Sequence, residues 1–175
     1  MDKQIILAVD EDGKFSGEYI PKEVGHTGEG KRHLAITVLL YNNKGQVLLQ
    51  KRKHKIFDNI WDITGATHPL HADAGDESLE EATRRCLKIE WGIREIRKIR
   101  VIGSFNYFAK YGKYCENEHC AIMVGEYNGP LNLNPEVGYE YKWMDKSEFL
   151  QDIEKNPKKY SPWTIKAAKI IKQNG

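Results

Sequence analysis

One stretch of the chain decides its fold, and it reads Ser78-Leu79-Glu80-Glu81-Ala82-Thr83-Arg84-Arg85-Cys86-Leu87-Lys88-Ile89-Glu90-Trp91-Gly92-Ile93. Apolar residues recur in it with a helical period, which predicts a helix within residues 76–93. Ser78 is placed to cap the first turn, with Glu81 three residues later completing a capping box, and Gly92 is placed to end the helix.

Strand-forming segments lie on both sides of this helix. Upstream we expect a hairpin at residues 4–9 and 14–20, a polar loop at 21–32, and core strands at 33–41 and 46–51. Downstream we expect strands at 99–108, 119–127 and 139–144, a helix capped by residues 145–148, and a last helix at 163–173. This interleaving predicts one domain over residues 1–175, of the α/β class.

Composition narrows the classes of function. The 175 residues are 40% hydrophobic, enough for one core and a small-molecule pocket. The 27 basic and 25 acidic residues leave a net charge of +2, which predicts no nucleic-acid or membrane partner. We expect a monomer or a homodimer. The N-terminal residues 1–4 lack the features of a signal peptide, so we expect a cytoplasmic protein. Three cysteines without a close pair, Cys86, Cys115 and Cys120, are expected to be reduced.

The sharpest chemical feature is Glu116-Asn117-Glu118 beside the strand predicted at 119–127. If this segment is extended, side chains two residues apart share a face, so both carboxylates can reach one cation. His26, His33 and His68 each stand at the boundary of a segment. Imidazole and carboxylate together suit Zn²⁺, Mn²⁺ or Fe²⁺, whereas Mg²⁺ prefers oxygen. A structural role explains any single histidine equally well, so the prediction of a metal site rests on all five residues.

With these residues the chain resembles the type 1 isopentenyl-diphosphate isomerases, a branch of the Nudix superfamily, over nearly its whole length. The resemblance is carried by the hairpin, the loop 22–33, the strands around Gly45, and the motifs Trp61, Thr67-His68-Pro69, Arg84-Arg85, Glu90-Trp91-Gly92-Ile93, Tyr107, Glu116-Asn117-Glu118 and Tyr160-Ser161-Pro162-Trp163. It implies a Nudix-type α/β/α sandwich with a mixed sheet and an N-terminal β-hairpin. It also implies that His26, His33, His68, Glu116 and Glu118 bind a divalent metal (Zn, Mn or Mg).

The resemblance assigns further roles around a small-molecule diphosphate. Lys22, Arg52 and Lys55 match positions that bind the diphosphate, and Glu90 matches one that holds a second Mg²⁺ bridging to it. Trp61, Tyr107 and Trp163 match aromatic positions that stabilise a carbocation.

One departure concerns the chemistry itself. Family members place a cysteine and a glutamate on opposite sides of the substrate; the glutamate matches Glu118, with Tyr107 beside it, but the cysteine position holds Ala66. Alanine exchanges no proton, so efficient isomerisation needs a substitute, for which Thr64, Thr67 and a bound water are the nearby candidates. Cys115 and Cys120 are candidates through space.

Two alternatives stay open. A Nudix hydrolase needs a glutamate cluster in the helix, but the matching residues 85–93 keep only Glu90, and His71 stands where a glutamate is usual. A non-catalytic diphosphate-binding protein would explain Ala66 beside a full ligand set. Diphosphate recognition is also expected to differ, because the spacing from Arg52 to Trp61 is about two residues short and Cys86 replaces an arginine.

Overall fold

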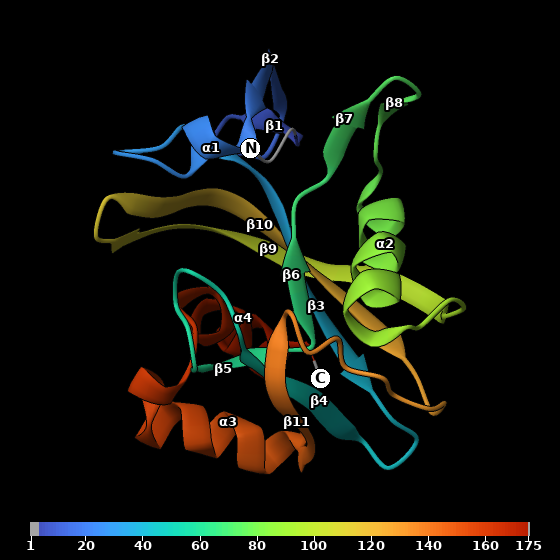
Figure 1. Cartoon of the computed structure of the whole chain (residues 1–175). Coiled ribbons are helices and arrows are strands. Elements are labelled where there is room, and N and C mark those ends of the chain that lie inside the picture. Colours follow the sequence, from blue (N-terminus) through green and yellow to red (C-terminus); the bar gives the residue numbers. More distant parts are fainter. Residues whose placement is uncertain (1–3, 175) are drawn as a thin grey trace.

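A computed structural model describes residues 4–174 of the chain, so residues 1–3 of the segment considered for a signal peptide lie outside it. The elements run in the order β1 (Ile5–Val9), β2 (Phe15–Pro21), α1 (Lys22–Gly25), β3 (His33–Tyr41), β4 (Gln46–Arg52), β5 (Trp61–Ile63), β6 (Gly65–Thr67), β7 (Leu70–Ala72), β8 (Gly75–Asp76), α2 (Leu79–Trp91), β9 (Arg97–Tyr111), β10 (Tyr114–Glu126), β11 (Gly138–Asp145), α3 (Lys146–Lys155), a 3₁₀ turn (Pro157–Lys159) and α4 (Pro162–Gln173). Figure 1 shows their arrangement.

The central feature of the sheet is that β3 and β4 separate. They pair at Tyr41 and Val47, beside their connecting turn. Beyond that point β3 pairs with β10 in parallel and with β6 antiparallel, while β4 pairs antiparallel with β5 and β11. The mixed sheet therefore opens into two halves, one made of β9, β10, β3 and β6 and the other of β11, β4 and β5 (Figure 1).

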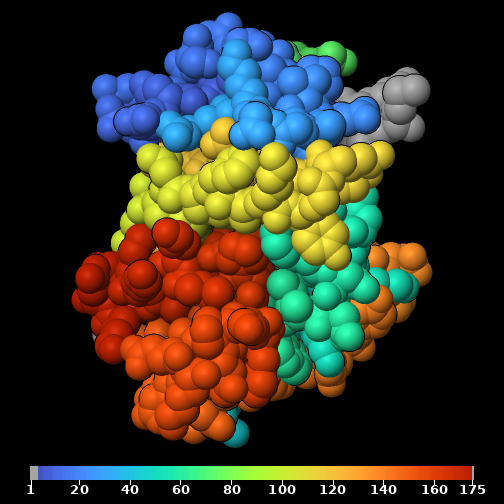
Figure 2. Space-filling model, turned by 90° about the vertical axis from the view of Figure 1, so that its left-hand side faces the viewer, coloured from blue at the N-terminus to red at the C-terminus, as the bar shows by residue number. Residues whose placement is uncertain are grey.

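Helices cover both faces of the sheet. Along β3, Val38 and Leu40 pack toward Leu87 and Trp91 of α2, whereas Leu39 packs against the buried residues of α3 and α4. The alternation follows from the two-residue period of a strand, and it gives the expected α/β/α sandwich. Figure 2 shows one side of the molecule, with the N-terminal segment above β9 and β10 and with α4 and α3 below them.

The expected helix forms as predicted. The Ser78 side chain accepts a hydrogen bond from the Glu81 backbone and the Glu81 side chain accepts one from the Ser78 backbone, which completes the capping box. Gly92 ends the helix in the left-handed conformation, with φ of 68°. The N-terminal hairpin also forms, since β1 pairs antiparallel with β2.

Three local predictions need correction. The loop predicted at 21–32 contains the short helix α1, and the stretch from Trp61 to Asp76 forms four strands of two or three residues that were not predicted. Asp145 precedes α3 but its side chain makes no capping hydrogen bond, and the helix runs to Lys155. The three cysteines are buried and form no disulfide, as expected. Among residues 4–174, no helix is long and apolar enough to cross a membrane.

Candidate active site and metal centre

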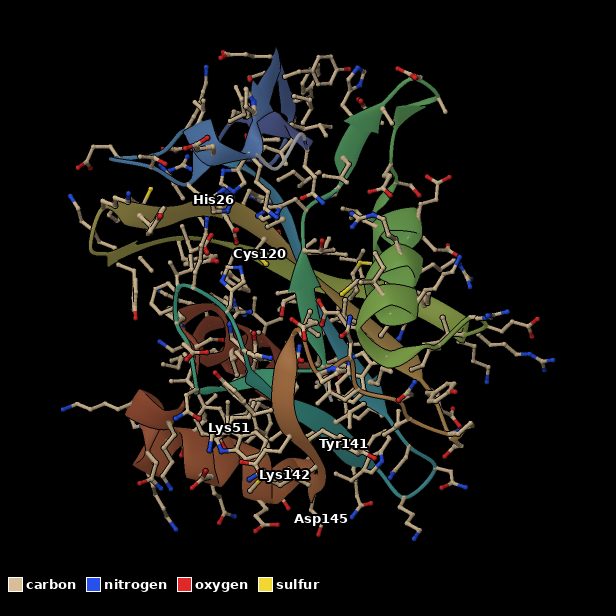
Figure 3. The ribbon with its side chains drawn as sticks, in the orientation of Figure 1. His26, Lys51, Cys120, Tyr141, Lys142 and Asp145 are labelled. Carbon is tan, nitrogen blue, oxygen red and sulfur yellow. The ribbon has the colours of Figure 1, made fainter. Side chains whose placement is uncertain are left out.

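Five side chains converge where β10, β3 and the N-terminal segment meet. Ligand atoms of His26, His33, His68, Glu116 and Glu118, here called the metal cluster, all lie within 4.8 Å of one another. The parallel register pairs Glu118 with His33, and Glu116 shares the face of Glu118 because it lies two residues away. His26 follows α1 and His68 follows β6, so both reach the cluster from connecting segments. Figure 3 labels His26, between the N-terminal segment and β10.

The hydrogen bonds of two histidines set which ring nitrogen faces the cluster. His26 Nδ1 lies 2.7 Å from the Lys22 carbonyl and His33 Nδ1 lies 2.7 Å from the Lys31 carbonyl. A carbonyl oxygen only accepts, so each Nδ1 carries the hydrogen and each Nε2 presents a lone pair. This backbone contact is the usual support of a metal-binding histidine.

The carboxylates stand opposite these lone pairs. Glu116 Oε2 lies 3.1 Å from His26 Nε2, and Glu118 Oε1 lies 2.9 Å from His68 Nε2 and 3.5 Å from His33 Nε2. His33 Nε2 and Glu116 Oε2 are buried without a hydrogen-bond partner. Burying unpaired polar atoms is unfavourable, and a divalent cation that accepts nitrogen and oxygen donors would satisfy both of them.

Electrostatics favour neutral imidazole at the centre of the cluster. Burial, together with the neighbouring His26 and His33, holds the pKa of His68 well below its usual value. Burial lowers the pKa of His26 as well, but the close contact with the charged Glu116 carboxylate outweighs it and leaves that pKa raised. A neutral His68 keeps the lone pair that metal binding requires.

Tyr107 completes the surroundings of Glu118. The two residues pair across β9 and β10, and the Tyr107 hydroxyl donates to Glu118 Oε2 at 2.5 Å. Burial, and then the charge of Glu118, raise the pKa of Tyr107 well above its usual value. Tyr107 therefore keeps its proton while Glu118 contacts the histidines through its other oxygen.

The metal cluster forms one wall of a cavity of about 650 Å³ that opens between the two half-sheets. This size is typical of a small-molecule site. Ala66, Tyr107, Cys120 and Trp163 line it beside the cluster. Thr67 also lines the cavity, whereas the Thr64 hydroxyl is buried between the backbones of Leu40 and Leu48. Cys120, labelled in Figure 3, and Cys86 line the cavity, and Cys115 does not.

The predicted diphosphate-binding residues lie on the same cavity. Lys22 lines it while donating to Gln4 Oε1 at 2.9 Å, and the Lys55 ammonium lies 4.9 Å from the ring centroid of Tyr114. Glu90 accepts a hydrogen bond from Gln50 Nε2 at 3.0 Å. Burial raises the pKa of Glu90 to about 7.

Arg52 is held by Asp62, a residue that was not predicted. Asp62 is fully buried and accepts hydrogen bonds from Arg52, Ser161, Trp163 and Thr164 at 2.6–3.2 Å. The Arg52 guanidinium also lies 4.7 Å from the ring centroid of Trp163. An acidic residue between apolar Trp61 and Ile63 was the available signal, because a buried carboxylate needs such donors.

The predicted site residue Trp61, and His71 at the position of a hydrolase glutamate, lie elsewhere. Trp61 is outside the cavity, and its ring faces the ammonium groups of Lys142 and Lys51. Figure 3 labels these two lysines. The reason is strand alternation: Asp62 points toward Arg52 and Trp163, which line the cavity, so its neighbour Trp61 points away. His71 bonds to Asp76 at 2.7 Å and stacks on Tyr19, also away from the cavity.

The sequence of this chain is similar to those of known proteins. The model of the NUDIX domain family matches residues 31–164. Isopentenyl-diphosphate Delta-isomerase 2 of Aromatoleum aromaticum is 30% identical over 93% of this chain and 83% of that protein. Isopentenyl-diphosphate Delta-isomerase of an Enterobacter species is 27% identical over 93% and 88%.

Solved structures agree on the fold. DR0079 from Deinococcus radiodurans superposes with a TM-score of 0.64 at 18% identity, covering 87% of this chain and 90% of that one. The MutT NUDIX hydrolase of Burkholderia pseudomallei gives 0.60 at 16% identity, covering 81% and 98%. The expected fold and the resemblance drawn from the sequence are both confirmed: the chain belongs to the Nudix family and is a member of its isopentenyl-diphosphate isomerase type.

Proposed function

We propose that this protein is a divalent-metal-dependent enzyme that moves protons on a small prenyl diphosphate, in the manner of isopentenyl-diphosphate isomerase. The observation that carries the proposal is the metal cluster with Tyr107 bonded to Glu118 on the wall of the cavity. The isomerases that the chain resembles over most of their length support the choice of substrate.

The metal cluster is proposed to hold the cation. Three imidazoles and two carboxylates suit Zn²⁺ or Mn²⁺ better than Mg²⁺. When bound, the cation supplies positive charge that stabilises ionised Glu118.

Tyr107 and Glu118 are proposed to exchange a proton with the substrate carbon. Their side chains share a hydrogen bond at the cavity surface, so a proton can pass between them as the substrate reacts. The rings of Tyr107 and Trp163 lie 6.2 Å apart and offer aromatic faces to positive charge that develops on the substrate.

The diphosphate is proposed to bind between the metal cluster and the loop that joins β4 to β5. Lys22, beside the metal cluster, and Arg52 and Lys55, at the loop, supply positive charge there, and Glu90 would hold a Mg²⁺ that adds positive charge for the diphosphate. The methyl group of Ala66 supplies no proton, so the second proton transfer depends on Thr67 or on bound water and is expected to be slow.

A paired assay tests this proposal. Metal-loaded wild type and Ala66→Cys are incubated with isopentenyl diphosphate in D₂O, and deuterium uptake is followed by NMR while metal content is measured. We expect slow uptake by the wild type and a rate roughly 100- to 10,000-fold higher in Ala66→Cys. Ala66→Ser is the matched control for side-chain size. Full metal content without deuterium uptake in either protein would disprove the isomerase proposal.

The same mixtures separate the alternatives. Release of inorganic phosphate or diphosphate would indicate a hydrolase, although Glu90 is the sole carboxylate of α2 that lines the cavity. Binding of isopentenyl diphosphate without either reaction would indicate a diphosphate-binding protein.

A further inference from the structure

The loop between β4 and β5 forms the side of the cavity opposite the metal cluster, through Lys53, His54, Lys55 and Ile56. Hydrogen bonds to its own end and to a neighbouring segment fix the conformation of this loop. Lys53 N donates to the Val137 carbonyl at 2.8 Å, and Asn59 N donates to the Arg52 carbonyl at 2.9 Å.

Asp58 secures the middle of this loop. Its carboxylate accepts from His54 N at 3.1 Å and from the Tyr139 hydroxyl at 3.2 Å. Phe57 and Asn59 have φ of 52° and 56°, which residues with a side chain adopt only where the surroundings impose it. The loop therefore presents His54 to the cavity in a defined position.

One ring nitrogen of His54 is available to a ligand. Nδ1 lies against the Ile56 backbone, 3.3 Å from its carbonyl oxygen and 3.4 Å from its nitrogen. Nε2 forms no hydrogen bond with any residue from 4 to 174. His54 belongs to no predicted motif, and it was not among the predicted site residues.

The charges around His54 are mostly positive. Arg52, Lys53 and Lys55 flank it on the chain, Lys22 faces it from α1, and the acidic neighbours are Asp58 on the loop and Glu116 on β10. Burial lowers the pKa of His54, and the charges of Arg52 and Lys22 lower it further. The imidazole is therefore neutral at neutral pH before an anion enters.

We propose that His54 contacts the anionic head group of the ligand and takes up a proton from solvent when that head group binds. This inference rests on the proposed function, since it assumes a diphosphate in the cavity. A diphosphate brings several negative charges beside Arg52 and Lys22 and reverses the local potential that keeps the ring neutral. The solvent proton binds the ring nitrogen that carries none in the neutral imidazole, and the resulting imidazolium donates a charge-assisted hydrogen bond from Nε2 to a phosphate oxygen.

Titration calorimetry with inorganic diphosphate and Mg²⁺ tests the proposal on metal-loaded protein at pH 7.5. Measurements in two buffers of different ionisation enthalpy give the number of protons taken up. We expect His54→Gln to take up fewer protons than the wild type, by up to about one per site, and to bind roughly 10- to 100-fold more weakly. His71→Gln, outside the cavity, is the matched control and should equal the wild type.

A second variant separates charge from folding. His54→Lys carries a permanent charge, so it should bind diphosphate about as tightly as the wild type while the proton uptake assigned to His54 disappears. Diphosphate binding with equal proton uptake in wild type and His54→Gln would overturn this inference and leave the proposed function standing. Absence of diphosphate binding by the wild type would overturn both.

Discussion

The two sides of the cavity are built in different ways. The metal cluster takes three of its five residues from β3 and β10, so strand register places them. The opposite side, called here the loop wall (Arg52 to Ile56, with Asp62 and Trp163), depends on one buried carboxylate and on a connecting loop. The metal cluster keeps every residue that the family resemblance implies, whereas the loop wall differs from it in length and in the place of Trp61.

The largest expected effect comes from breaking the metal cluster at its centre. Glu118→Gln keeps the shape but removes the charge that His33, His68 and Tyr107 face. We expect deuterium exchange into isopentenyl diphosphate to fall roughly 100- to 10,000-fold, because a positioned proton-transfer group is lost. Glu126→Gln, at the far end of the same strand, is the control; exchange within about tenfold of wild type in Glu118→Gln would contradict the assignment.

The loop wall is broken by Asp62→Ala. The variant leaves the largely buried Arg52 guanidinium without its counter-charge and removes an acceptor from Ser161, Trp163 and Thr164. We expect the free energy of unfolding to fall by about 3–5 kcal/mol in urea titrations. Asp73→Asn, at an exposed turn, should change it by less than about 0.5 kcal/mol. A similar small change in Asp62→Ala would show that the network contributes little.

Addition of a metal ion distinguishes the two sides of the cavity, because the ion is expected to bind the metal cluster and not the loop wall. Zn²⁺ or Mn²⁺ at a hundred times its dissociation constant should raise the free energy of unfolding by about 2.7 kcal/mol, and a chelator should reverse the gain. Thermal unfolding with and without metal measures it. His33→Ala should lose the gain, while His71→Gln, which lies outside the cavity, should keep it. An equal gain in His33→Ala would place the cation elsewhere.

The smallest expected effect concerns the pH dependence of Glu90. Its pKa is about 7 in the folded protein against 4.5 for an ordinary glutamate, so the folded state holds the proton over a range where the unfolded state has lost it. Stability linked to this group is therefore present at low pH and declines as pH rises through that range. In metal-free protein, Glu90→Gln should gain about 1–2 kcal/mol relative to wild type between pH 5 and pH 8, since the side chain is only partly buried. A constant difference across this range would contradict the raised pKa.

The features that could be predicted from the sequence belong to α2 and to the metal cluster, and those that could not belong to the loop wall. The helix α2 carries its own start and stop signals in Ser78, Glu81 and Gly92. The position of Glu116 and Glu118 on one face of β10 follows from the two-residue period of a strand. Trp61 was misplaced because the strand β5 has three residues, too few to show which side faces the cavity. Asp62 and His54 were missed because their importance arises from partners distant in the chain or from a loop conformation that no local pattern specifies.

The parallel pairing of β10 with β3 has a consequence for how the chain reaches its native state. A slip of one residue between these strands would turn Glu116 and Glu118 to the other face of the sheet and bring Asn117 and His119 into their places. A mispaired chain would therefore lack the carboxylates that complete the cluster. Cation binding during refolding would therefore stabilise only those chains in which β10 and β3 pair in the native register.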